Sequence, residues 1–351
     1  MKSKRILVVA TSRKTRGGIT AVVNAHEQGE QWKKYHIRWI GAYIDRNNVL
    51  KILYFVFSFI SYLVFLPFYD LVHIHVSTHT SVFRKSFYLY PAKLLGKKII
   101  THLHCSTPAI IYEKKYRALY RRAFLASDVV FVLSSQWKKY VEEALDVKNN
   151  VRVLYNPIVN LPSEDVTYQK KKYILFAGTI DKRKGYHDLI IAFSGLAPLH
   201  PDWKLVFAGN GEIAEGQALA ASLRISSQVE FRGWVSGKQK EQLFGEASIH
   251  CLPSYAEGFP MSVLDAWAYS LPVVCTPVGG IPDVGKDGEN VLLFEAGDIE
   301  KLREQLERLI TDEKLRVRIA SESHKLSKTV FNLEHINAQL GKVYKELLEK
   351  R

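Results

Sequence analysis

The stretch of sequence that decides the fold is residues 248–283, SIHCLPSYAEGFPMSVLDAWAYSLPVVCTPVGGIPD. It begins with a short apolar run, which predicts a buried strand that ends at Pro253. A loop that contains one acid, Glu257, follows, and residues 261–269 then predict a helix with an apolar side. Residues 271–276 predict a second buried strand. Strand, acidic loop, helix and strand form a βαβ unit, and ligands of such sheets bind at the carboxyl ends of the strands.

Two carboxylates in this unit are candidates for ligand contacts. Glu257 precedes the helix, and Asp265 follows eight residues later, inside it. The loop amides at Gly258 and Phe259, together with the free N–H groups of the helix that starts after Pro260, would surround an anion. A phosphate at the helix start, a sugar hydroxyl on Glu257 and a ribose on Asp265 would make one ligand, a nucleotide-sugar. The structural alternative is an acid near a helix start and a solvated helix position.

The donor-site motif of the retaining glycosyltransferases of family 4, which have the GT-B fold, resembles one part of this stretch, PSYAEGFPMSVLDAWAYSLPVV. Members typically carry two glutamates separated by seven residues, where this chain has Glu257 and Asp265. Trp267 and Ser270 stand where members have methionine and glycine. The resemblance implies an α/β chain of two Rossmann-like, doubly wound domains that face each other across a cleft, with Glu257 as a catalytic residue and Asp265 on the donor's ribose.

A basic loop before the next predicted helix contains a second candidate contact. Residues 178–185, GTIDKRKG, place Arg183 and Lys184 side by side at a helix start, which suits a diphosphate by charge and by free amides. A solvated surface loop is the structural alternative. Family members typically read G-R-L-x-x-x-K-G here, so Lys184 matches, while Thr179 occupies the usual arginine position. We expect Arg183 to take over that role.

Three further residues of the second half are implied in donor binding by the resemblance. Gly209 and Gly211 follow a predicted strand and resemble the family's G-x-G. Trp234 lies in the predicted strand at residues 229–235, after which members hold the nucleobase with backbone groups. The chain contains no Asp-x-Asp motif, so we expect no metal and no cofactor, and the charge on the departing diphosphate would be met by Lys184, Arg183 and backbone amides.

The first half begins with a predicted strand at residues 5–10 and the loop TSRKTRGG. Gly17 and Gly18 would let a ligand approach the backbone closely at a helix start, whereas the structural alternative is a simple turn. The spacing does not fit a G-x-G-x-x-G dinucleotide fingerprint. By resemblance, the glycine pair lines the cleft opposite the donor and contributes to the donor site.

Two predicted strands, at residues 70–77 and 98–106, each carry His-x-His near the end. Adjacent parallel strands would bring His75 and His104 together, and with His79 nearby they could imitate a metal site. No acidic residue follows either strand end as a second-shell partner and no cysteine pair has ligand spacing, so we expect no metal there.

The resemblance assigns a role to one of these histidines. His104 matches the histidine that family members carry at this strand end, facing the donor sugar, and we expect it to be catalytic. His73 and His102 are expected to be satisfied core or groove histidines.

The net charge of +14 is concentrated in the first half of the chain. Residues 1–160 contain 25 Lys and Arg against 9 Asp and Glu, whereas the remainder is close to neutral. An anionic partner is therefore expected. Nucleic acid is disfavoured because no zinc finger, ribonucleoprotein motif or helix-turn-helix signature is present. An anionic membrane surface or a phosphorylated substrate fits better.

Residues 50–68, LKILYFVFSFISYLVFLPF, have nearly the length that spans a bilayer. Spanning is disfavoured, because the strands before and after this segment should share one parallel sheet on one side of a membrane. We expect a helix with one face packed on the sheet and the other in the membrane interface. Serine at Phe55, Phe59 and Leu63 is expected to weaken that contact. A basic helix predicted at residues 112–126 is either a solvated face or a contact for an acidic membrane or lipid diphosphate.

The organisation follows from a polar linker at residues 156–172. Residues 1–160 form an expected acceptor-binding domain, residues 161–331 an expected nucleotide-sugar-binding domain, and the helix at 332–351 is expected to pack back on the first. Three cysteines fit a reducing compartment, and the N-terminal apolar run is too short for a signal peptide. Oligomeric state is left open.

The combined prediction is a retaining, metal-independent transferase that moves a sugar from a UDP-sugar to a lipid-diphosphate-linked saccharide acceptor. Its expected place is the cytoplasmic face of the cell membrane, in assembly of a bacterial surface polysaccharide. Two alternatives are left open: a nucleotide-sugar epimerase of the same architecture, and a catalytically silent partner subunit that binds sugar-nucleotide.

Overall fold

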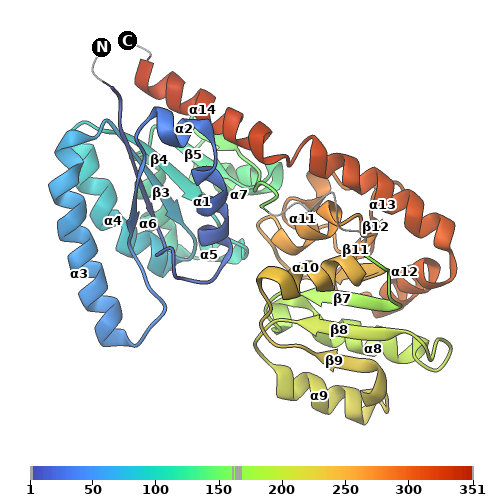
Figure 1. Ribbon diagram of the computed structural model, residues 1–351. Coiled ribbons are helices and arrows are strands. Elements are labelled where there is room, and N and C mark those ends of the chain that lie inside the picture. The colour runs from blue at the N-terminus through green and yellow to red at the C-terminus, as the bar shows by residue number, and fades with distance from the viewer. Residues whose placement is uncertain (1–2, 160–161, 163–167, 350–351) are drawn as a thin grey trace. The chain divides into compact units, whose positions relative to one another are not determined.

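The structure is a computed structural model that describes residues 3–159, 162 and 168–349. It divides into two compact units. Unit 1 comprises Met1–Val159 and Asn332–Arg351, and unit 2 comprises Asn160–Phe331. Each unit contains a six-stranded parallel sheet with helices around it (Figure 1).

The sheet of unit 1 has the strand order β2-β1-β3-β4-β5-β6. Its strands are β1 (Ile6–Ala10), β2 (Arg38–Gly41), β3 (Leu71–Val76), β4 (Lys98–Leu103), β5 (Val129–Val132) and β6 (Val151–Val153). The helices of this unit are α1 (Gly18–Glu27), α2 (Glu30–Lys34), α3 (Asn48–Phe65, followed by a 3-10 turn, Leu66–Phe68), α4 (His79–Leu94), α5 (Ala109–Tyr112), α6 (Lys114–Leu125), α7 (Ser135–Leu145) and α14 (Leu333–Glu349).

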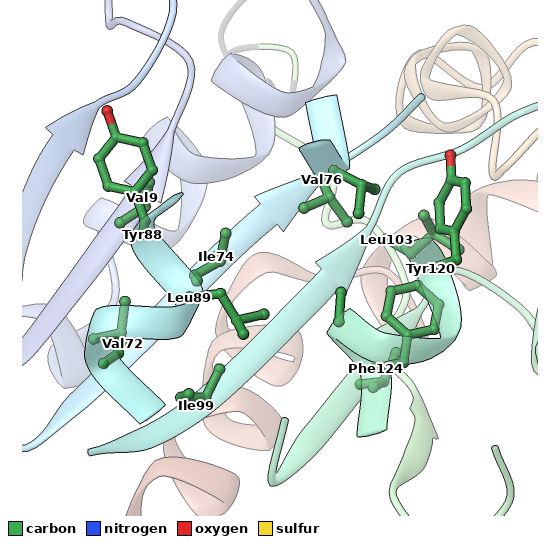
Figure 2. Packing of buried hydrophobic residues seen from close by; sticks show 14 of the residues in the cluster. Val9, Val72, Ile74, Val76, Tyr88, Leu89, Ile99, Leu103, Tyr120 and Phe124 are labelled. Carbon is green, nitrogen blue, oxygen red and sulfur yellow. The ribbon is translucent and has the colours of Figure 1, made fainter. Parts of the chain in front are cut away.

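Both faces of this sheet are buried, as the unbroken apolar runs of its central strands require. Figure 2 shows one face, where Val72, Ile74 and Val76 of β3 pack with Leu89 of α4 and Phe124 of α6. The alternate residues of β3 point to the opposite face, where Leu71 joins a second core together with residues of α1 and α14. The two histidines of β3 also lie on this second face.

The sheet of unit 2 has the order β12-β11-β10-β7-β8-β9. Its strands are β7 (Tyr173–Ala177), β8 (Lys204–Ala208), β9 (Val229–Phe231), β10 (Ile249–Leu252), β11 (Val273–Cys275) and β12 (Leu292–Leu293). The helices are α8 (Tyr186–Leu196), α9 (Ile213–Ser222), α10 (Gly237–Glu246), α11 (Met261–Ala268), α12 (Ile299–Thr311) and α13 (Glu313–Lys328), with short 3-10 turns at Lys182–Lys184, Ser226–Gln228 and Ile281–Asp283. Two parallel α/β sheets confirm the predicted fold class.

Each sheet has a point where the strand order reverses. In unit 2 the strands that follow β7 run outward through β8 and β9, and the chain then returns to place β10 on the other side of β7. In unit 1 the corresponding point lies between β1 and β3. Ligands of open α/β sheets bind outside the carboxyl ends of the strands at this point. The loops after β7 and β10, and those after β1 and β3, are therefore where a site is expected.

Helix α3 exposes most of its apolar surface and packs beside α4 (Figure 1). Its inward side includes Phe55 and Phe59, whose rings meet Tyr88 of α4 edge-on at centroid distances of 6.0 and 5.6 Å. The prediction that these two phenylalanines face lipid is therefore wrong, because the helix needs them to pack on α4. Leu63 does lie on the exposed side. Sequence periodicity could not choose the side, since the segment is apolar all round.

Two element boundaries also differ from the prediction. The helix expected at residues 112–126 is divided at Glu113, whose extended backbone separates α5 from α6. The strand expected at residues 229–235 ends at Phe231, and Gly233 then takes a left-handed conformation with φ of 63°. Trp234 consequently lies in the loop after β9 rather than within the strand.

Candidate active site

The loops after β7 and β10 contact each other at the reversal point of unit 2. The backbone N–H of Tyr255 donates to the carbonyl of Arg183 at 2.7 Å. Gly185 has a left-handed φ of 70°, and a Cβ there would lie 2.0 Å from the carbonyl oxygen of Pro253. Only glycine fits this close approach of two backbones. The K-G pair of the sequence thus places Lys184 against the loop that contains Glu257.

Glu257 is buried and accepts hydrogen bonds from two neighbours. Lys184 Nζ forms an ion pair with its Oε1, and Ser254 Oγ donates to the same oxygen at 2.8 Å. Arg183 Nη1 lies 3.7 Å from this carboxylate and donates to the carbonyl of Ala256 at 2.9 Å. Two cations and one carboxylate therefore meet at one point, which is an arrangement that can hold a diphosphate beside a sugar hydroxyl.

The segment between Glu257 and α11 is fixed by a buried ring. Phe259 packs against Phe331 at a centroid distance of 4.9 Å. Gly258 and Pro260 flank it, and α11 begins directly after the proline. In the first turn of α11 the Oγ of Ser262 is buried without a hydrogen-bond partner among the described residues. Amides and a hydroxyl at a helix start suit an anion, so Ser262 is a further candidate donor to a phosphate at this position. The phosphate position itself stays a prediction.

Asp265 is buried in α11, so the alternative of a solvated helix position is wrong. Its Oδ2 forms an ion pair with Lys240 Nζ of α10 at 2.6 Å. Burial raises the pKa of the Asp265 carboxyl, and the charge and hydrogen bond of Lys240 oppose that rise. The sequence reasoning did not identify Lys240, because nothing in its local pattern separates it from the other surface lysines of α10.

The remaining donor-site candidates of unit 2 lie in loops after neighbouring strands. A Cβ at Gly209 would lie 1.7 Å from the carbonyl oxygen of Gly178, so the loop after β8 rests directly on the loop after β7. A Cβ at Gly211 would likewise lie 2.2 Å from the carbonyl oxygen of Ile180. Trp234 follows β9, the next strand, and has an exposed fraction of 46%.

The candidates of unit 1 lie after β1 and β4. Gly17 has a φ of 141°, which side-chain-bearing residues rarely adopt, and Gly18 is the first residue of α1. A Cβ at either glycine would meet no atom within 4 Å. The backbone there is open to an approaching ligand. His104 follows β4, and its Nε2 lies 2.9 Å from Nδ1 of His75.

The four histidines of β3 and β4 form one row. Ligand nitrogens of His73, His75 and His102 lie within 4.8 Å of one another, and all three side chains are buried. The rings of His73 and His75 stack at 24°, and those of His73 and His102 at 10°. The ligand nitrogens are close enough to hold a metal ion, but nearly parallel ring planes point their in-plane lone pairs poorly at a single ion. The expectation of no metal here therefore stays a prediction. His79, which the sequence placed nearby, stacks instead on Tyr116 at 3.9 Å.

The expectation that His73 and His102 are satisfied is wrong in part. His73 Nδ1 bonds to the hydroxyl of Tyr344 at 2.7 Å, but its Nε2 and both ring nitrogens of His102 have no partner among the described residues. Burial lowers the pKa of all four histidines, and for His104 the pKa falls to about 3 with a further contribution from the charge of Lys85. The row is therefore neutral at neutral pH.

The sequence-predicted residues thus divide between the two units, and the structure shows direct contact for Arg183, Lys184 and Glu257. In unit 2 they are Arg183, Lys184, Gly209, Gly211, Trp234, Glu257, Gly258, Phe259, Pro260 and Asp265. In unit 1 they are Gly17, Gly18 and His104. Three contributors were missed, namely Ser254, Lys240 and Ser262, whereas the meeting of His75 with His104 was expected. Ser254 belongs to the P-S of the motif, so the motif could have identified it. Lys240 could not be identified in this way, because it lies in α10 and its partner Asp265 lies in α11.

Comparison with known proteins covers most of the chain. Residues 15–159 match the model of Glycosyltransferase Family 4, and residues 160–326 match that of Glycosyl transferases group 1. An uncharacterized glycosyltransferase of Haemophilus influenzae is 31% identical over 58% of this chain and 58% of its own length. A lipopolysaccharide core biosynthesis glycosyltransferase of Rhizobium meliloti is 30% identical over 46% of each chain.

A solved structure shows the same fold over nearly the whole chain. HepE of Anabaena, in complex with UDP and glucose, has a TM-score of 0.76 and 17% identity, covering 98% of this chain and 100% of its own. The two family models are consecutive and between them cover residues 15–326, and the sheets described above agree with their fold. The chain belongs to the group 1, family 4 glycosyltransferases of GT-B fold.

Proposed function

We propose that this chain transfers a glycosyl group from a UDP-sugar to a lipid-diphosphate-linked saccharide, with retention of anomeric configuration and without a metal ion. The observation that carries the proposal is the meeting of Lys184, Arg183 and Glu257 at the strand-order reversal of unit 2. A UDP complex of HepE, which shares the fold, supports UDP as the nucleotide. The name of the Rhizobium relative supports a saccharide acceptor of the cell surface.

The chemistry is the exchange of one bond at the anomeric carbon. The bond from C1 to the β-phosphate oxygen breaks, a bond from C1 to the acceptor oxygen forms, and the acceptor proton passes to the departing phosphate. Charge develops on the phosphate in this step, and Lys184, Arg183 and the start of α11 are the groups that stabilise it. Because Lys184 also pairs with Glu257, a bound donor would share this lysine between the carboxylate and the diphosphate.

His104 is proposed to contact the donor sugar. Its imidazole is neutral, because burial and Lys85 lower its pKa to about 3. A neutral imidazole exchanges hydrogen bonds with a hydroxyl and does not neutralise a phosphate. In this proposal Lys184 and Arg183 contact the diphosphate, and His104 contacts a sugar hydroxyl. Gly17 and Gly18 give the backbone access that the same ligand would need.

The proposed location is the cytoplasmic surface of the membrane. Asn48–Phe68 is the one described helical segment long and apolar enough to cross a membrane, by length and composition alone. It connects β2 and β3, which both pair with β1 in one sheet. A membrane-spanning α3 would place neighbouring strands of one sheet on opposite sides of the bilayer. We therefore place α3 in the membrane interface, where its exposed apolar side chains contact lipid. The lysines and arginines of α6 would contact anionic headgroups.

Binding of nucleotides tests the donor side of this proposal. Calorimetric titration with UDP, GDP and uridine, in the presence of a chelator, should show UDP binding more tightly than uridine, since the diphosphate contacts are lost in the nucleoside. A requirement for one divalent ion would contradict the metal-free site. Interconversion of a UDP-sugar with no acceptor present would identify an epimerase, and tight UDP binding without turnover of any acceptor would identify a silent partner subunit.

A further inference from the structure

A buried polar network lies directly behind His104, on the face of the unit 1 sheet that α1 and α14 cover. His73, His75 and His102 occupy alternate positions of β3 and β4, and their rings stack in a row that ends at His104. Strand pairing sets this row, because His75 stands opposite His102 in the register of β3 and β4. One hydrogen bond joins the row to His104, between Nδ1 of His75 and Nε2 of His104 at 2.9 Å.

We propose that His75 is a positioning residue that fixes both the ring orientation and the tautomer of His104. A neutral imidazole has one N–H donor and one bare nitrogen that accepts. In a hydrogen bond between two neutral imidazoles one nitrogen must donate and the other accept. The tautomers of His75 and His104 are therefore coupled: Nδ1 of His104 is a donor when His75 donates to Nε2, and an acceptor when His75 accepts from Nε2.

The position of His75 is itself held by two contacts, one to its backbone and one to its ring. The buried Lys85 donates from Nζ to the backbone carbonyl of His75. The ring of His73 stacks on His75 at a centroid distance of 4.4 Å, and Nδ1 of His73 bonds to the hydroxyl of Tyr344 at 2.7 Å. Rotation of His75 would break the stack and expose a buried face, so one orientation is favoured.

As a consequence, His104 has one ring nitrogen available to a ligand, and its tautomer decides whether this nitrogen donates or accepts a hydrogen bond. Its backbone N–H donates to the carbonyl of Val76 at 2.7 Å, its Nε2 is occupied by His75, and its Nδ1 has no partner among the described residues. A catalytic hydrogen bond requires the correct tautomer as well as the correct distance. This inference rests on the proposed function, in which that nitrogen meets a hydroxyl of the donor sugar.

The experiment compares three variants. Each one retains either an aromatic ring in the histidine row or a polar partner for the hydrogen bond of residue 75 with His104. His75→Phe retains the ring and removes the hydrogen bond, whereas His75→Asn retains a polar atom near the position of Nδ1. His73→Phe is the matched control, because it alters the same strand and the same stack without touching His104. Thermal unfolding of each variant reports whether the fold survives.

Two readouts are measured on the full chain. The first is the tautomer of His104, read from ring ¹⁵N shifts of histidine-labelled protein. The second is transfer from a UDP-sugar. We expect one tautomer in the wild type, in His75→Asn and in His73→Phe, and a mixture in His75→Phe. We expect kcat of His75→Phe to fall by about 10- to 100-fold with donor KM changed by less than about 3-fold, as for loss of a contact made in the transition state.

The two readouts separate failure of this inference from failure of the proposed function. A single unchanged His104 tautomer in folded His75→Phe would overturn the positioning role whatever the activity. Equal losses of kcat in His75→Asn and His75→Phe would do the same. Full activity of a His104→Phe variant would instead remove His104 from the reaction, while the tautomer measurement would still decide the role of His75.

Discussion

Glu257 combines burial with two donors, and this makes it the residue whose removal is most informative. We expect Glu257→Gln to lose transfer by about 100-fold or more while UDP still binds. In the proposed function this carboxylate contacts the sugar end of the donor, and its loss releases Lys184 to the diphosphate. Steady-state kinetics together with UDP calorimetry measure both effects. Asp202→Asn, an exposed acid paired with Lys172, is the control and should retain activity. Near-normal turnover of Glu257→Gln would contradict its assignment.

Lys184 is expected to act on phosphate and not on the base. The variant Lys184→Gln should weaken UDP binding by about 10-fold or more and leave uridine binding nearly unchanged, since a charged hydrogen bond contributes about 1.5–3 kcal/mol. Calorimetry with both ligands checks this. Lys204→Gln removes an exposed lysine that pairs with Glu230 and should change neither affinity. Equal weakening of the two ligands by Lys184→Gln would place this lysine elsewhere.

Asp265, the shorter acid of this chain's motif, is buried in an ion pair with Lys240. Lys240→Met leaves a buried carboxylate without its cation and should lower the free energy of unfolding of unit 2 by about 1–3 kcal/mol. The double variant Lys240→Met with Asp265→Asn should regain part of that stability, because the buried charge is removed. It should bind uridine more weakly than the wild type, because the proposed contact of the Asp265 carboxylate with the ribose is lost. Denaturant titration and calorimetry separate the two effects. Uridine binding unchanged in the double variant would show that Asp265 does not hold the ribose.

Local motifs were enough to predict the residues of unit 2 that lie next to one another in sequence. Glu257 and Lys184 were identified because each belongs to a loop with a recognisable pattern. The meeting of His75 with His104 was expected from adjacent strands. The ion pair of Glu257 with Lys184 and that of Asp265 with Lys240 were not, because they depend on which loops and helices are neighbours. Register and helix rotation decide such contacts, and a single sequence does not specify them residue by residue.

Helix α3 shows the same limit for an entire element. Length and composition predicted an apolar helix, and the structure contains one, but the direction of its faces came from packing against α4. The exposed side is formed by Phe57, Ile60 and Val64, with exposed fractions of 74, 57 and 59%. Their spacing of three and four residues puts them on one face.

This exposed face of α3 is expected to hold the protein on membranes. Serine at Phe57, Ile60 and Val64 should weaken binding to anionic vesicles by about 10-fold or more, and the binding that remains in high salt should fall most, since salt screens charge but not apolar insertion. Vesicle co-sedimentation measures this. Serine at Ile191, Leu199 and Val317, three exposed apolar residues of unit 2, is the matched control. Equal binding by the two triple variants would remove α3 from the interface.

The molecule as a whole distributes its buried histidines unevenly. Among described residues, unit 1 holds His26, with a pKa lowered to about 4, and the row of four, whereas unit 2 holds His250, with a pKa lowered to about 3 by burial. In the unfolded chain imidazoles keep a pKa near 6.5. As pH falls below that value the unfolded chain takes up protons first, so the free energy of unfolding falls until the folded pKa is reached.

Unit 1 should therefore lose stability more steeply than unit 2 between pH 6.5 and 4. His26 alone accounts for a loss on the order of 3 kcal/mol over this range. Hydrogen exchange followed by mass spectrometry, at stepped pH, resolves the two units. His26→Gln should flatten the pH dependence of unit 1 and leave that of unit 2 unchanged. Opening of unit 2 before unit 1 on acidification would contradict the buried neutral histidines.

Alternating strands and helices predicted parallel α/β sheets from periodicity, whereas the order of the strands in each sheet came only from the structure. The burial of α11 and the joining of the loops after β7 and β10 were not predictable either, because they depend on backbone approaches such as that of Gly185 to Pro253. Those approaches are what bring the cations of one loop to the carboxylate of the other.

Transfer itself tests the central claim most directly. The purified chain is incubated with chelator, a panel of UDP-sugars and lipid-diphosphate-linked saccharides in anionic vesicles, and the product's anomeric configuration is read by NMR beside UDP release. The account predicts UDP release that depends on acceptor, survives the chelator and gives a product with the configuration of the donor. Inversion at the anomeric carbon, dependence on a metal ion, or conversion of donor without acceptor would contradict it.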